Sequence, residues 1–145
     1  MRKRFSSSHS GQVTVEFAFA ISIFLLLVLT VIEGGRLMFT WTLLSDASRV
    51  GARTAILTTT TDTTTVKNAV VNTAKWVPGL TNTNVAVTKT DIGGTTTTLN
   101  GAYTKTRETD TLTVRITYTF NFLSGRILPF TSRAIIVETD MKAEG

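Results

Sequence analysis

The fold is decided by the stretch Gly11-Gln-Val-Thr-Val-Glu16 and by the apolar run that continues from it to Ile32. Between residues 13 and 32, Glu16 is the only charged side chain. About 20 residues, at a rise of 1.5 Å each, are enough to cross the hydrocarbon core of a bilayer. A buried core helix is the alternative, but the length and the uniform apolarity favour a membrane helix. The sequence therefore predicts a transmembrane helix with one carboxylate near its start.

A short basic segment precedes this helix and contains Arg2, Lys3 and Arg4. Because positively charged flanks stay on the cytoplasmic side, we expect the N-terminus in the cytoplasm and everything after Glu33 outside. An ordinary secretory signal is cut behind its apolar region and loses it.

Here the plausible cleavage site, between Gly11 and Gln12, lies before the apolar region, which would then stay in the mature protein. Glu16 would become the fifth mature residue. This arrangement resembles the leader of a type IV prepilin, and it implies a subunit that is held in a membrane and later packs into a filament.

Further motifs make the resemblance narrower. They are Val15-Glu16-Phe17-Ala18 after the Gly11-Gln12 pair, Ile32-Glu33-Gly34-Gly35-Arg36-Leu37, and Ala47-Ser48-Arg49-Val50-Gly51-Ala52-Arg53. Together they resemble the TadE-like pseudopilins of tight-adherence (Tad) pilus systems over residues 11 to about 57. The resemblance implies a minor pilin of the bacterial inner membrane that is cut by a prepilin peptidase and used to build or prime a pilus.

Composition limits the chemistry that the chain can carry. There is no cysteine among the 145 residues, which excludes disulfides, thiol catalysis and cysteine metal sites. The single histidine, His9, lies in the leader, so the mature chain would have none. Removing Arg2, Lys3 and Arg4 from the 15 basic residues leaves 12 against 10 acidic residues, and the formal net charge falls from +5 to about +2. The high pI is mostly an effect of the leader, and we expect no nucleic-acid partner.

The helix is expected to continue beyond the membrane. Small and apolar residues recur every three or four positions, which predicts one helix from about residue 13 to residue 57, roughly 65 Å long. A sheet would cover this stripe, which comprises Leu37, Trp41, Leu44, Ser48, Gly51 and Ala55.

Two features are expected at the membrane boundary. Glu33 and Arg36 are spaced to form an ion pair on one helix face. Between them, Gly34-Gly35 stands where the family resemblance implies an aromatic residue, and glycine weakens a helix. The glycines predict either a kink or a close approach of neighbouring helices, since small residues do both in membranes.

The remaining chain predicts a small domain of one helix and several strands. Asp62 or Thr63 would cap a helix over residues 64–76, which Pro78-Gly79 ends. Strands are expected over residues 85–90, 111–122 and 133–142, with Asn100-Gly101 as a tight turn between weaker strands and breaks at Ser124-Gly125 and Pro129. In the clearest strand the inward residues are Leu112, Val114, Ile116, Tyr118, Phe120 and Phe122; in the last strand they are Ile135, Val137 and Met141.

These elements define the predicted fold class and domains. The fold class is α+β, pilin-like, with a long N-terminal transmembrane helix that extends into an antiparallel sheet of three or four strands. The domains are a leader (1–11), the transmembrane half of the helix (12–33), its extracytoplasmic half (34–57) and a globular α+β domain (58–145).

Threonine makes up about a fifth of the chain and clusters at residues 58–65 and 95–98. Such runs on an exported surface are possible carriers of O-linked sugars. The simpler interpretation is a solvated linker and strand face, because threonine favours strands and its hydroxyl suits exposed edges.

No set of residues indicates an enzyme, a cofactor or a metal. Glu138 and Asp140 share one strand face, but it is the outward face, and a solvated pair is expected. Glu108 and Asp110 fall in a predicted turn and are also expected to be solvated. The Asp91-Ile-Gly-Gly stretch is too short for a calcium loop.

Glu16 is different, because an ionised carboxylate in hydrocarbon is costly and usually has a functional partner. After cleavage the nearest partner is the α-amino group of Gln12, in the same chain or in the next subunit. The alternative is that Glu16 lies solvated near the headgroups and has no role.

Two functions remain open at this point. The first is a structural pilus subunit with a prepilin peptidase, other pilins and the lipid bilayer as partners. The second is a single-pass, membrane-anchored adhesion or binding domain that never enters a filament.

Overall fold

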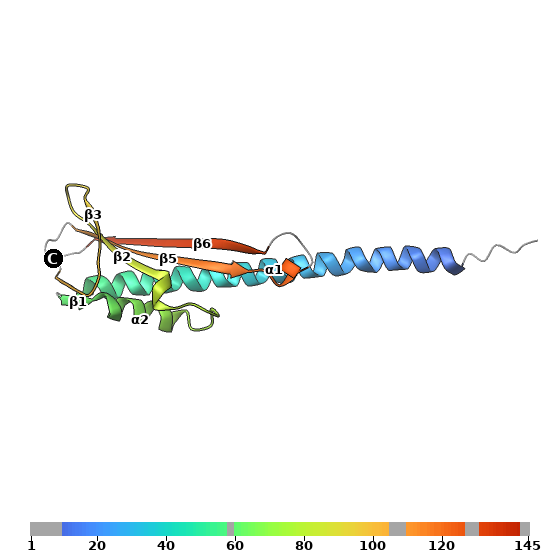
Figure 1. Cartoon of the computed structure of the whole chain (residues 1–145), viewed down its shortest axis with the longest axis horizontal. Coiled ribbons are helices and arrows are strands. Elements are labelled where there is room, and N and C mark those ends of the chain that lie inside the picture. The colour runs from blue at the N-terminus through green and yellow to red at the C-terminus, as the bar shows by residue number, and fades with distance from the viewer. Residues whose placement is uncertain (1–9, 58–59, 105–109, 127–130, 143–145) are drawn as a thin grey trace, which may run out of the picture.

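The computed structural model describes residues 10–57, 60–104, 110–126 and 131–142. Within them, one long helix projects from a small α+β domain that is built on its second half (Figure 1). The predicted fold class is confirmed. The leader residues 1–9, Glu108 and Pro129, about which the sequence made predictions, lie outside the described ranges.

Helix α1 (Ser10–Leu57) has 48 residues and is therefore about 72 Å long. It continues through Gly34 and Gly35 without a break, so the predicted extension beyond the apolar segment is confirmed. A Cβ added at either glycine would meet no atom within 4 Å, so the domain leaves this part of the helix uncovered.

The other elements follow in a compact order. They are β1 (Thr60–Asp62), helix α2 (Thr63–Thr73), the 3-10 turn η1 (Asn82–Asn84), β2 (Val85–Thr90), β3 (Thr96–Thr98), β4 (Ala102–Thr104), β5 (Thr111–Asn121), the 3-10 turn η2 (Leu123–Arg126) and β6 (Ser132–Lys142). The main sheet is antiparallel in the order β3-β2-β5-β6. A two-stranded sheet of β1 and β4, which the sequence did not predict, completes the domain.

Strand β5 has the predicted phase. Leu112, Val114, Ile116 and Phe120 are buried, whereas Arg115, Thr117 and Thr119 on the opposite face are exposed. Strand β6 pairs with β5 over its whole length, from Thr111 opposite Lys142 to Asn121 opposite Ser132, and it buries Ile135 and Val137. The sheet therefore turns one apolar face toward α1.

The second half of α1 packs against the sheet through small residues. Ala47, Ala52 and Ala55 are fully buried, and Ser48 bonds to Thr139 of β6 across the interface, with 2.6 Å between the two hydroxyl oxygens. Gly51 marks the closest approach, because a Cβ there would lie 2.5 Å from Cγ2 of Val70. Small side chains thus let α2 and β5 both reach the helix.

The prediction that the sheet covers the whole stripe was wrong for one residue, Trp41. Trp41 is 52% exposed, although Leu44 and Ser48 farther along the stripe are fully buried. The indole lies beside β6, which is the edge strand, and no further strand covers it.

Helix α2 begins at the predicted place. Asp62 is its N-cap, and the carboxylate accepts a hydrogen bond from the backbone N of Thr64 at 3.0 Å. The helix ends at Thr73, three residues before the predicted end. The chain turns there because the following tight turns bury Ala74, Val77 and Leu80 in the core.

The weaker strands predicted on either side of Asn100-Gly101 are present, but they do not form a hairpin. The flanking strands β3 and β4 belong to different sheets and do not pair. Gly101 has a positive φ of 86°, and its backbone exchanges two hydrogen bonds with Thr63 at the start of α2. The turn therefore bonds to the N-terminus of α2. There the backbone N–H and the hydroxyl of Thr63 take the place of partners on a paired strand.

Candidate membrane and subunit-assembly site

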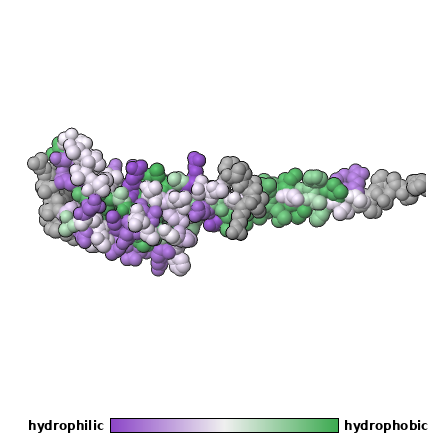
Figure 2. Space-filling view, viewed as in Figure 1, coloured by the Kyte–Doolittle hydropathy of each residue, from purple (hydrophilic) through white to green (hydrophobic). Residues whose placement is uncertain are grey.

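The first half of α1 stands alone. Among residues 11–32 every side chain is exposed except that of Leu29, which is half-buried at the start of the domain. Figure 2 shows this apolar surface on the projecting helix, in contrast to the mainly hydrophilic domain. Within the described residues, α1 is the one helix long and apolar enough to cross a membrane. A helix that is apolar on all sides and unburied in its own chain requires lipid or other helices around it.

The predicted cleavage and assembly residues lie together at the tip of this helix. The side-chain amide of Gln12 donates to Oε1 of Glu16, at an N–O distance of 3.0 Å, across one turn. A Cβ at Gly11 would meet nothing within 4 Å. The first turn of a helix has no intrahelical partner for its N–H groups, so the backbone around Gly11 opens at low cost. Cleavage between Gly11 and Gln12, and pairing of Glu16 with the Gln12 amine, remain predictions.

The domain begins where the apolar segment ends, and Glu33 joins the two. Glu33 is 6% exposed. Its Oε1 accepts from the backbone N of Ser124 at 2.9 Å, and its Oε2 lies 3.1 Å from Nη1 of Arg36. The Arg36 guanidinium in turn lies 5.2 Å from the ring centre of Phe120. Both carboxylate oxygens are therefore used to attach η2 and β5 to the helix.

The sequence predicted the contact between Glu33 and Arg36 but not Ser124, which is 91 residues away along the chain. The structure gives the pair a role within the chain: it fixes the base of the domain to α1. That this level coincides with the membrane surface remains a prediction.

The other carboxylates do not form a site. Glu138 pairs with Arg115 at 2.8 Å and Asp140 accepts from Thr113 at 2.6 Å, both on the outer face of the sheet, where the sequence placed them. Asp110 is a correction, because it is 2% exposed and lies 2.7 Å from Nζ of Lys89. Lys89 of β2 compensates this buried charge. Among the described residues no group of three His, Cys, Asp or Glu side chains could hold a metal.

Comparison with known families identifies the N-terminal part of the chain. Residues 11–53 match the family model described as TadE-like protein, which includes both the apolar half of α1 and most of the half that carries the domain. This match confirms the resemblance drawn from the motifs around Glu16, Glu33 and Gly51, and it indicates a Tad pilus-related protein. The TadE-like family is structural and non-enzymatic, and its members are associated with other pilus subunits. Comparisons with curated proteins and with solved structures give no match.

Proposed function

We propose that this chain is a pseudopilin, a membrane-held structural subunit that is used in the assembly of a Tad-type pilus. A prepilin peptidase cuts the precursor between Gly11 and Gln12. Residues 12–33 then hold the subunit in the bacterial inner membrane, with the α+β domain on the outer side. From there the subunit enters the filament together with other pilins.

One observation carries this proposal: half of a single continuous helix is apolar on every side and, apart from Leu29, is exposed in its own chain. An anchor alone would need such a segment, but it would not need the chain to keep a rigid helical connection into the domain core. Here the same helix is anchor and core element, so a force or a packing contact on residues 12–33 acts directly on the domain. The family match over both halves supports the same function.

The first experiment tests processing. The N-terminal mass of the membrane-bound protein is measured with and without a prepilin peptidase, and a new N-terminus at Gln12 is expected only with it. Gly11→Val should block the cut if the enzyme accepts only a small side chain there. Gly35→Val, a glycine outside the cleavage region, is the matched control and should be processed normally. A functional protein that retains Met1 would contradict the proposal.

The second experiment tests assembly. In a bundle of subunits Glu16 loses access to headgroup water, and the amine of Gln12 in an adjoining chain becomes a natural counter-charge. Glu16→Ala should insert into the membrane and be cut, but it should co-purify less with filament components. Glu138→Ala, which removes an exposed carboxylate from the sheet, is the control. Normal amounts of Glu16→Ala in sheared filaments would remove the assembly role, and absence of the unmodified chain from filaments would favour the anchored adhesion domain.

A further inference from the structure

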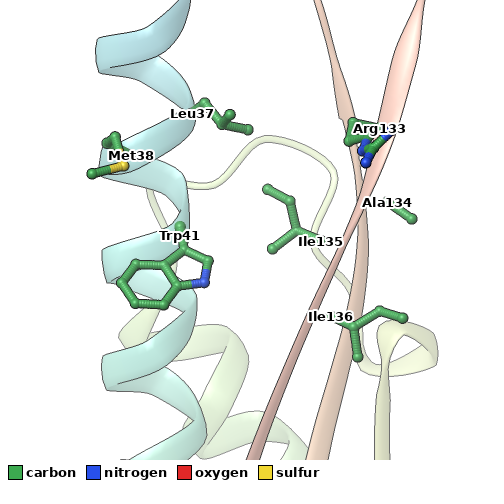
Figure 3. Close-up of a pocket in the computed structure, with 7 residues that line it drawn as sticks. All are labelled: Leu37, Met38, Trp41, Arg133, Ala134, Ile135 and Ile136. Carbon is green, nitrogen blue, oxygen red and sulfur yellow. The ribbon is translucent and has the colours of Figure 1, made fainter.

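A groove runs along one side of the domain between α1 and the edge strand β6. Three adjoining hollows form it, with Leu37 and Arg133 shared by the first two and Trp41 and Ile136 shared by the second and third. The middle hollow has a volume of about 490 Å³. We call this feature the α1–β6 groove; in Figure 3, Leu37 and Ile135 point toward one another across it.

The first two hollows of the α1–β6 groove are apolar, the third is lined mainly by polar side chains, and the described part of the chain leaves all three open. Met38, Trp41 and Ile136 along it are 66%, 52% and 51% exposed. Its wall, β6, is an edge strand of 11 residues, and long edge strands are normally protected. A contiguous apolar surface beside such an edge marks an interaction site.

We propose that the α1–β6 groove binds the first half of α1 from a second copy of this chain. The inference rests on the proposed function, and it specifies which surface of one subunit receives the helix of the next. Within the described residues, the first half of α1 is apolar and almost wholly exposed, and the apolar part of the groove is open. Their lengths agree: residues 12–32 span about 30 Å, and so does the groove from Leu29 to Arg49.

Charge complementarity indicates the register, because Arg133 borders both apolar hollows of the groove. Arg133 is exposed at the groove, and no carboxylate of the described residues pairs with it. Glu16 is the single charge on the incoming helix before Glu33. Arg133 is therefore a counter-charge for Glu16 in addition to the Gln12 amine, and the uncharged residues 17–25 of the incoming helix lie along the apolar middle hollow.

The register can be expressed as an axial offset. Ser48 of α1 contacts Thr139 of β6. The six residues from Thr139 back to Arg133 cover about 20 Å of strand, which is the length of helix from Ser48 back to about residue 35. Arg133 therefore lies level with about residue 35 of α1. Placing Glu16 of the second copy at that level offsets the two parallel helices by about 19 residues, or roughly 28 Å.

At this offset the second domain begins near the end of the first copy's α1. The second domain begins at Glu33, which comes level with about residue 52 of the first copy, close to the end of α1 at Leu57. Each copy offers a helix on one side and a groove on the other. Such a head-to-tail contact does not close on itself and repeats along an axis, as a filament requires.

The test is disulfide cross-linking in cells that assemble the pilus. Because the chain has no native cysteine, a disulfide between two copies can form only through the introduced residues. Ile136 lies level with about residue 41, so Ile23 of the second copy should face it, one helical period of seven residues from Glu16 on the same side. The variant Ile23→Cys/Ile136→Cys should give a ladder of dimers and higher species. Ile21→Cys/Ile136→Cys is the matched control, because residue 21 lies about 140° around the helix from Glu16.

The charge pair is tested in the same background. Arg133→Glu should reduce the cross-linked fraction about tenfold, whereas Arg133→Lys, which keeps the charge, should retain it. Equal cross-linking of the Ile21 and Ile23 variants, exclusive cross-linking to a different protein, or no response to Arg133→Glu would each overturn the proposal. If the cysteine variants are cut at Gly11 and enter filaments without any cross-link, the groove assignment fails while the proposed function stands. Absence of the unmodified chain from filaments removes both.

Discussion

The two halves of α1 have the same backbone and opposite surroundings. Residues 11–32 are apolar on every side and almost wholly exposed, whereas residues 33–57 bury one face under β5, β6 and α2. The difference lies in side-chain size. Residues 33–57 turn Gly51, Ala52 and Ala55 toward the domain. Residues 11–32 include large side chains such as Phe17, Phe24 and Leu27. Small residues permit close packing within one chain, while large apolar residues on all sides require lipid or other subunits.

This comparison predicts that the halves can be damaged separately. The largest effect should come from Ile116→Asp, which places an unpaired charge in the fully buried centre of β5. The domain should unfold while residues 11–32 of α1 still insert into the membrane. Circular dichroism in detergent and membrane fractionation measure the two outcomes.

Thr117→Asp is the matched control, since the neighbouring residue of the same strand is exposed. It should fold normally. If both variants fold, the phase of β5 is wrong; if Ile116→Asp also fails to insert, the two halves are not independent.

A smaller effect is expected at the junction between the halves. Glu33→Ala removes the acceptor of the buried Ser124 N–H and the partner of Arg36, which should cost about 1–3 kcal/mol of unfolding free energy. Urea denaturation measures it. Glu138→Ala breaks the half-exposed pair with Arg115 and should cost at most about 1 kcal/mol. Equal losses would show that Glu33 does not anchor the domain.

The sequence predicted the parts of this architecture that depend on local patterns. The uniform apolarity of residues 13–32, the alternation in β5 and the Asp62 cap all depend on neighbours along the chain, and each was confirmed. The fold-level outline followed from them.

Contacts between distant segments could not be predicted in this way. Asp110 was predicted to lie in a solvated turn, but β2 brings Lys89 beside it. The Asn100-Gly101 turn was predicted from its own residues, but its hydrogen bonds to Thr63 of α2 were not. The same holds for Ser124 at Glu33. Trp41 fits the helical stripe, and only the order of the sheet leaves it at an uncovered edge.

The smallest predicted effects compare two glycines of α1 directly. Gly51→Ala places a methyl group 2.5 Å from Val70 Cγ2 and 3.4 Å from Val114 Cγ1, both fully buried, so overpacking of about 1–3 kcal/mol should exceed the gain of up to about 1 kcal/mol in helix propensity. Gly35→Ala meets nothing within 4 Å and should show only the gain, a rise of a few degrees in Tm for a domain of this size. Thermal denaturation in detergent distinguishes the signs. Gly35→Ala should therefore stabilise the isolated chain, and a drop in its incorporation into filaments would show that Gly35 serves a close approach between subunits. If Gly35→Ala destabilises the isolated chain, the helix does not continue through Gly35 as described, and the rigid connection between the two halves of α1 is lost.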